Sequence, residues 1–382
     1  MKILELESNR TTYIEMASTG IINYLRDSSN KSLADFVPSE IYHMIDPYWY
    51  SWPPMEPMWF GVIGFFVSIL GVMSLSGNFI VMYIFTSSKS LRTPSNMFVV
   101  NLAFSDFMMM FTMFPPMVLN SFYQTWIMGP LLCEIYGLCG SLFGCVNIWS
   151  MTLIARDRYN VIVKGISRKP LTATGALIQL LVIWCICGIW SILPMLGWNR
   201  YVPEGNLTVC GTDYFAKDWW NRSYIMVYFV WVYVTPLSTI IYSYWYIMKA
   251  VRIHEQQMRE QAKKMNVASL RNSEADKGKS VEIKLAKVAL VTISLWFFAW
   301  TPYTVINFSG IFGSMYLSPL STVLGSAFAK ANSVYNPIVY GLSHPKYKQV
   351  LREKMPCLAC DRKDTGSDAK TQVTAEYSES VA

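Results

Sequence analysis

The sequence predicts an all-α membrane protein, a seven-transmembrane helix bundle followed by a short amphipathic helix. Hydrophobic residues make up 53% of the 382 residues and charged residues only 15%, against about a quarter in ordinary soluble domains. Seven apolar segments each reach the roughly 20 residues needed to cross a hydrocarbon core. The chain therefore divides into an N-terminal tail (1–57), the bundle (58–342), and the short helix with a disordered tail (343–382).

Each predicted span is a nearly uninterrupted apolar run. Prolines such as Pro236, Pro302 and Pro337 lie inside these runs, and spanning helices tolerate them where neighbouring helices satisfy the freed carbonyl groups. Beyond the last span, the stretch from His344 to Lys354 has the pattern of an amphipathic helix on a membrane surface. The predicted spans are 58–86, 96–121, 131–162, 172–197, 223–250, 285–312 and 317–342.

Lysine and arginine are concentrated in the loops after the first, third and fifth spans. The loops after the second and sixth spans contain neither residue, so the positive-inside rule predicts a cytoplasmic C-terminus and an extracellular N-terminus. The net charge of +7 thus suits a membrane surface and not a nucleic acid. Three sequons, at Asn9, Asn30 and Asn206, then lie outside, where they can be glycosylated.

Lys330 lies deep in the seventh span, too far from either end for its ammonium group to reach water. A charge at that depth costs about 2.5–3.5 kcal/mol on insertion scales and indicates a functional site. A buried amine can condense with an aldehyde to form a Schiff base. A lysine paired with an acid in a water-filled cavity, as in a transporter, explains the residue equally well.

Other polar residues within the spans suggest a switch. Asn78, Asp106 and the Asn336-Pro337 pair lie in the first, second and seventh spans. Because buried polar groups need hydrogen-bond partners, we expect a hydrated network that links these three helices. This network is not a ligand site.

Glu204 is a candidate counterion for a protonated imine. Cys133 begins the third span and Cys210 lies in the loop after the fourth. A disulfide between them would draw that loop over the bundle and bring Glu204, six residues from Cys210, toward Lys330. From the residues alone, a solvated loop acid is the commoner interpretation.

Three motifs together resemble the rhodopsin-type G-protein-coupled receptors. They are Asp157-Arg158-Tyr159, Trp300-Thr-Pro302-Tyr303 and Asn336-Pro-Ile-Val-Tyr340, in the third, sixth and seventh spans. The lysine six residues before the Asn-Pro pair distinguishes opsins from their relatives. Finer features resemble the rhabdomeric visual opsins of arthropods, closest to the insect long-wavelength type: His344-Pro345-Lys346, the segment 260–271, and Tyr136 where vertebrate visual opsins carry their glutamate counterion.

The resemblance implies a retinal pocket. The ligand would be 11-cis-retinal or its 3-hydroxy form, attached to Lys330, and the counterion role would pass from position 136 to Glu204. The implied pocket residues are Tyr136, Ser141, Gly144, Cys145, Tyr228, Val232, Trp296, Trp300, Tyr303 and Ser326.

The resemblance also implies signalling from the rhabdomeric plasma membrane through a Gq-class heterotrimeric G protein, with arrestin and a receptor kinase as further partners. Cys357 and Cys360 are candidates for palmitoylation, although free thiols fit equally well. No enzymatic activity and no metal site are expected. The implied switch residues are Asp157, Arg158, Tyr159, Tyr244, Asn336, Pro337, Tyr340, Asp106 and Asn78.

Two other functions remain as alternatives. A retinal photoisomerase would use the same lysine, but it would need neither the Asp157-Arg158-Tyr159 motif nor a long basic third loop. A diffusible-ligand receptor or a transporter would use Lys330 as a charged site. The third span has no acid between Glu134 and Asp157, which argues against a receptor for amines.

Overall fold

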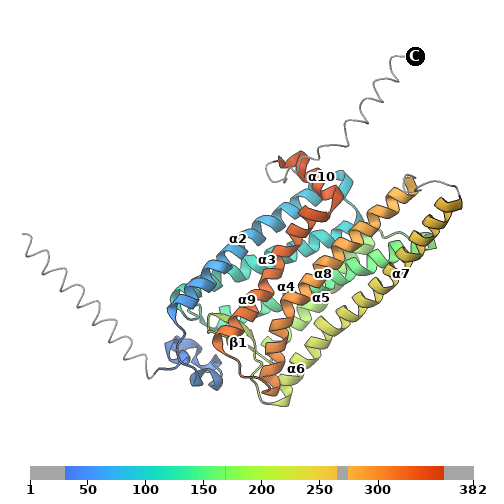
Figure 1. The fold of residues 1–382 in the computed structure, drawn as a ribbon. Coiled ribbons are helices and arrows are strands. Elements are labelled where there is room, and N and C mark those ends of the chain that lie inside the picture. The colour runs from blue at the N-terminus through green and yellow to red at the C-terminus, as the bar shows by residue number, and fades with distance from the viewer. Residues whose placement is uncertain (1–30, 168, 265–273, 357–382) are drawn as a thin grey trace, which may run out of the picture.

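The computed structural model describes residues 31–167, 169–264 and 274–356, and it shows an elongated helical bundle (Figure 1). A small β hairpin lies at one end of the bundle, and α10 (Pro345–Lys354) lies at the other; we call these the hairpin end and the α10 end. The bundle helices are α2 (Pro57–Ser87), α3 (Pro94–Tyr123), α4 (Gly129–Tyr159), α5 (Ala173–Ile192), α6 (Trp219–Phe229), α7 (Thr235–Lys264), α8 (Glu274–Phe312) and α9 (Pro319–Ser343).

Seven membrane crossings follow from these helices, because α6 and α7 form one continuous span. Six spans are long and apolar enough to cross a membrane on length and composition alone. The seventh is α9, which packs against α8 and α2 and is less apolar because it carries buried polar residues, among them Asn332 and Asn336. The predicted seven-helix fold is confirmed.

Short polar residues define where several helices begin. The side chains of Thr93, Thr172, Asp218 and Ser318 each accept a hydrogen bond from a backbone N–H of the following turn. These bonds satisfy donors that the helix itself leaves unpaired. At α10 the Nδ1 atom of His344 accepts the N–H of Tyr347 in the same way.

The fifth span contains a π-helical turn, η8 (Val230–Val234), between α6 and α7. Pro236 follows two residues after this turn and has no N–H to donate to the turn before it. The wider turn accommodates this break while the helix continues, and the hydroxyl of Thr235 donates to the carbonyl of Val230. Such turns are frequent at functional sites, and Val232 and Tyr233 from this turn line the cavity described below.

The hairpin consists of two antiparallel strands, β1 (Tyr201–Glu204) and β2 (Val209–Thr212), and covers this end of the bundle. The helical periodicity did not predict it. The predicted disulfide between Cys133 and Cys210 joins β2 to the start of α4, with Cα atoms 5.4 Å apart. The hairpin is almost entirely buried because a second layer lies outside it.

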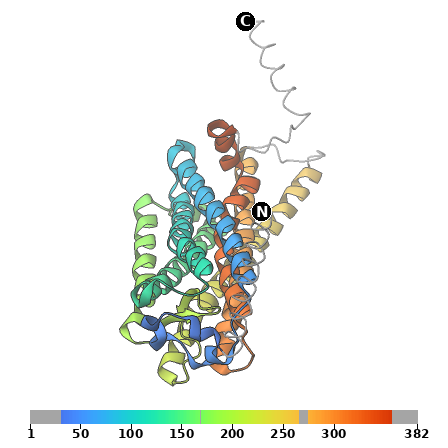
Figure 2. The same ribbon diagram turned by 90° about the vertical axis from the view of Figure 1, so that its left-hand side faces the viewer.

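That second layer is the N-terminal segment 33–51, which forms three short helical turns beside the hairpin (Figure 2). Leu33, Ile41 and Trp49 are buried in the same apolar cluster as Cys210 of the hairpin. The turns are η1 (Leu33–Phe36), η2 (Ser39–Met44) and η3 (Pro47–Ser51).

Candidate ligand-binding site

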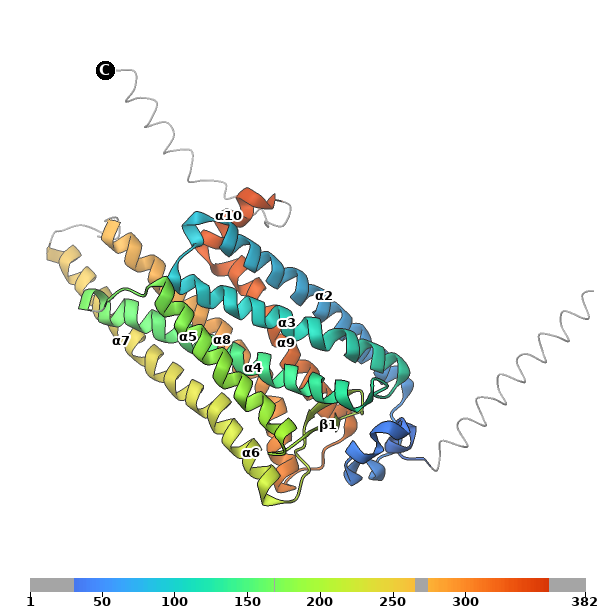
Figure 3. The ribbon, with the colours of Figure 1, turned by 180° about the vertical axis from the view of Figure 1, so that it is seen from behind.

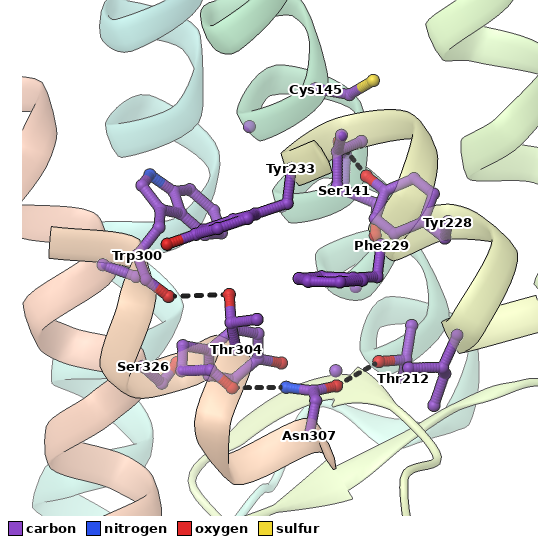
Figure 4. Close-up of a pocket in the computed structure, with 18 of the residues that line it drawn as sticks. Ser141, Cys145, Thr212, Tyr228, Phe229, Tyr233, Trp300, Thr304, Asn307 and Ser326 are labelled. Carbon is purple, nitrogen blue, oxygen red and sulfur yellow. Dashed lines mark hydrogen bonds between the residues drawn. The ribbon is translucent and has the colours of Figure 1, made fainter. Parts of the chain in front are cut away.

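An apolar cavity lies beneath the hairpin and between the helices, with walls from α3, α4, α6, η8, α8, α9, β1 and β2 (Figure 4). Most of the side chains that line it are aromatic or aliphatic, which suits a long hydrocarbon ligand. The pocket residues predicted from the sequence come together here, apart from Tyr136, which does not line the cavity but has its ring next to the Lys330 amine. The predicted residues that line the cavity are Ser141, Gly144, Cys145, Glu204, Tyr228, Val232, Trp296, Trp300, Tyr303, Ser326 and Lys330.

Lys330 reaches the cavity from the middle of α9 and is only 6% exposed. Its Nζ atom donates to the Oγ atom of Ser326, at 2.6 Å, one helical turn earlier. The ring of Tyr136 lies behind the amine, with its centroid 5.7 Å from Nζ. The amine also donates to the backbone carbonyl of Ser326 at 3.4 Å, and among the ion pairs of the described residues none involves it.

Glu204, at the end of β1, is 4% exposed and lines the same cavity. Its carboxylate accepts the hydroxyl of Tyr303 at 3.0 and 3.2 Å. Burial raises the pKa of Glu204 to about 7, although the charge of Lys330 and the Tyr303 hydrogen bond act in the opposite direction. The carboxyl group therefore becomes an anion readily only when a cation is near.

Two glycines give the site its shape. A Cβ atom at Gly211 would lie 2.5 Å from Oε1 of Glu204 and 2.6 Å from the hydroxyl of Tyr303, so any side chain there would separate the pair. A Cβ atom at Gly144 would lie 2.8 Å from the ring of Trp300. Gly144 was predicted from the family resemblance, whereas Gly211 was not predicted.

Several lining residues were not predicted, including Phe229, Tyr233 and Asn307 (Figure 4). Asn307 links α8 to the hairpin: its Oδ1 accepts the hydroxyl of Thr212 at 3.2 Å, and its Nδ2 donates to the carbonyl of Tyr303. A polar amide inside a predicted span was the available signal. The side chain is buried, with 6% exposed.

The predicted polar network forms around Asp106, but with a different membership. Its two carboxylate oxygens accept the side-chain amides of Asn147 and Asn336, both at 2.7 Å. Asn78 donates to the backbone carbonyl of Ser333 at 2.8 Å, and so joins α2 to α9 without a direct bond to Asp106. Asn147 on α4 was not predicted.

At the α10 end, Arg158 lies between two acids. Its guanidinium group contacts Asp157 of its own helix and Glu282 of α8, each at 2.5 Å. The hydroxyl of Tyr244 donates to the carbonyl of Ala286 at 3.0 Å and so ties α7 to α8. Glu282 was missed because the sixth span was predicted to begin at 285, whereas α8 begins at Glu274.

The remaining predicted switch and modification residues have different outcomes. Tyr340 is buried against Phe85, and Tyr159 packs on Tyr242. Asn206, a predicted glycosylation site, is fully buried in the turn of the hairpin, where its Oδ1 accepts the hydroxyl of Thr208. Asn9, Asn30, Cys357 and Cys360 lie outside the described residues.

The chain is similar to known receptors over most of its length. The family model described as "7 transmembrane receptor (rhodopsin family)" matches residues 77–340. "Opsin Rh6" of Drosophila melanogaster is 78% identical, over 94% of this chain and 97% of that protein. "Rhodopsin, long-wavelength" of Apis mellifera is 62% identical, over 87% and 88%. The crystal structure of squid rhodopsin superimposes with a TM-score of 0.77 and 34% identity, over 87% of this chain and 95% of that one. The chain therefore belongs to the rhodopsin family of seven-transmembrane receptors, as an arthropod visual opsin and not an enzyme.

Proposed function

We propose that this photoreceptor carries retinal on Lys330, as a Schiff base, and that light makes it activate a Gq-class G protein. The observation that carries the proposal is a single buried amine at the wall of an aromatic cavity that a buried carboxyl group also lines. The bound retinal would supply light absorption and a change of shape on isomerisation. We propose 11-cis-retinal, or its 3-hydroxy form, as the dark ligand.

The residues around the amine have separate roles in this proposal. Ser326 orients the Lys330 amine toward the cavity through its 2.6 Å hydrogen bond. Glu204 balances the positive charge of the attachment point, and the Tyr303 hydroxyl fixes that carboxylate. The apolar walls exclude water, which strengthens the attraction between the two charges.

Trp300 is proposed as the side chain that transmits the change of shape. It stacks on Trp296 with ring centroids 5.4 Å apart, and it lies against Gly144 with no room to move toward α4. Trp300 would therefore pass a change in the shape of the cavity to α8, which carries both tryptophans. Because α8 also carries Glu282, this movement would strain the contact between Glu282 and Arg158 at the far end of the helix.

The α10 end is proposed to face the cytoplasm, where the basic ends of α7 and α8 would receive the G protein. Arrestin and a receptor kinase would act on the same side in the rhabdomeric membrane. The ion pairs of Arg158 with Asp157 and Glu282 support a signalling function over photoisomerisation alone. An isomerase would not need a restraint between α4 and α8.

The proposal is tested by reconstituting the receptor with 11-cis-retinal and recording its absorption spectrum. A visible band should form in the wild type and in Ser326→Ala, which keeps the amine. It should be absent from both Lys330→Ala and Lys330→Arg, since neither offers a primary amine. A band that persists in these two variants would move the attachment site elsewhere. Light-driven nucleotide exchange on a Gq-class protein, compared with a Gi-class protein, tests the coupling.

A further inference from the structure

A second cavity is a groove on the outer surface of the bundle, between α7 and α8 in the half nearer the α10 end. The two helices run side by side there (Figures 1 and 3), yet over the described residues their backbones make few close contacts. Only Tyr233 lines both this groove and the ligand cavity. The groove is therefore a separate site.

The walls of the groove are apolar and face the membrane. The residues on each helix are three or four positions apart, which places them on one face of that helix. Ile241 is 58% and Trp245 is 72% exposed, and since α7 spans the membrane, lipid is what they meet. The principal wall residues are Ile241, Trp245 and Met248 on α7, with Leu290, Ile293 and Phe297 on α8.

The end of the groove nearest the α10 end is basic. Lys249 and Arg252 both line it and are exposed, and their spacing of three residues aims both along the same face. None of the ion pairs of the described residues involves either cation, and no acidic residue lines the groove. The apolar groove thus ends at two cations that form no ion pair with any described acid, near the point where the apolar stretch of α7 ends.

We infer that this groove binds one anionic phospholipid from the leaflet at the α10 end. An acyl chain would lie between α7 and α8 against Trp245, and the headgroup phosphate would contact Lys249 and Arg252. Each basic residue near a membrane surface favours anionic lipid, and the apolar walls add burial of the chain. A free phosphate ion would gain only the two exposed cations and none of the apolar contact.

Such a lipid would sense the distance between α7 and α8, because it would touch both. Two hydrogen bonds hold the helices at their present spacing, from Tyr244 to the Ala286 carbonyl at 3.0 Å and between Tyr233 and Thr301 at 2.7 Å. A lipid that binds this spacing of α7 and α8 more tightly than a wider one would stabilise the present spacing. The gain in free energy equals the difference between its binding free energies for the two spacings. The inference rests on the membrane crossing and the groove, and it holds whether or not retinal is the ligand of the inner cavity.

The test uses the full-length receptor in phosphatidylcholine nanodiscs that contain a fraction of brominated lipid. Bromine quenches tryptophan fluorescence on contact, and the difference between the wild type and Trp245→Phe isolates the signal of Trp245. We expect brominated phosphatidylserine to associate with this site roughly tenfold more strongly than brominated phosphatidylcholine. In Lys249→Gln/Arg252→Gln the ratio should approach one.

A matched control removes the same charge, at the same spacing, from α8. Lys284 and Lys287 are exposed but do not line the groove, so Lys284→Gln/Lys287→Gln should keep the preference of the wild type. A further variant, Ser294→Phe, fills the groove and leaves both cations in place, and it should also abolish the preference. An equal loss in the control pair, a preference that survives Ser294→Phe, or equal binding of both lipids to the wild type would each overturn the inference.

Discussion

Glu204 shows how a single side chain depends on its surroundings. It lies on a strand outside the helices, and its role is set by burial, by the Tyr303 hydroxyl and by the absence of a side chain at Gly211. An acid in a loop is ordinarily solvated, so only the family resemblance could select it from the sequence. Lys330 could be predicted without that help, because an amine within an apolar run is costly wherever the helix packs.

Replacing this carboxyl group tests the proposed balance of charges. In the pigment, Glu204→Gln should lower the pKa of the protonated Schiff base by at least about one unit, since a nearby anion favours the protonated form and one unit is about 1.4 kcal/mol. The band of the variant should therefore shift to the blue at a lower pH than that of the wild type. Titration of the absorption spectrum measures the change.

The control for this substitution is Glu134→Gln. This acid lies near the start of α4 and does not line the cavity. The titration of that variant should match the wild type. An unchanged titration in Glu204→Gln would return the counterion role to another group.

At the scale of the elements, the helices could be predicted closely and the short irregular pieces could not. Apolar runs located seven spans, but the π turn η8 and the hairpin depend on contacts with other segments. The start of α8 was misplaced because its first turns are polar, and a rule based on hydrophobicity therefore begins the helix too late. Glu282 lies in those turns and was therefore not predicted as a partner of Arg158.

The ion pair between α4 and α8 should restrain the receptor. Glu282→Gln removes the charge that Arg158 meets on α8, and because the glutamate is 35% exposed the loss should be about 1 kcal/mol or less. That corresponds to roughly a fivefold larger population of the separated form. We expect a similar increase in light-independent nucleotide exchange on the G protein.

Glu255→Gln is the control for this measurement, since it removes an acid from the exposed surface of α7 near the same end. Its basal exchange rate should equal that of the wild type. If Glu282→Gln shows no increase, the ion pair does not restrain α8.

For the whole molecule, the hairpin end is closed by three segments that are distant in the sequence. The N-terminal segment, the loop after β2 and the turn before α9 meet at Tyr48, whose hydroxyl donates to the carbonyl of Leu317 and accepts its N–H. The ring of Tyr48 stacks on Phe215 with centroids 4.2 Å apart. Such a closure arises from tertiary contacts alone, so local sequence patterns did not reveal it.

Loss of this hydroxyl should loosen the closure. Tyr48→Phe keeps the ring but leaves the backbone groups of Leu317 without their partner, which costs about 1 kcal/mol. Hydroxylamine, which attacks a Schiff base from water, should then bleach the dark pigment roughly fivefold faster. Tyr50→Phe, at an exposed neighbouring ring, should bleach at the wild-type rate, and equal rates in the two variants would show that Tyr48 does not limit access.

The crosslink between Cys133 and Cys210 has a consequence for how the molecule matures. The two cysteines are 77 residues apart, and Cys210 is paired in register with Pro203, next to Glu204. Before these two thiols are oxidised to the disulfide, a newly made chain already has Lys330 but lacks the covalent link that restrains the strand carrying Glu204. Under the proposed function, a chain whose Cys133 and Cys210 stayed reduced would lack this restraint on its counterion, so formation of the visible band would depend on passage through an oxidising compartment.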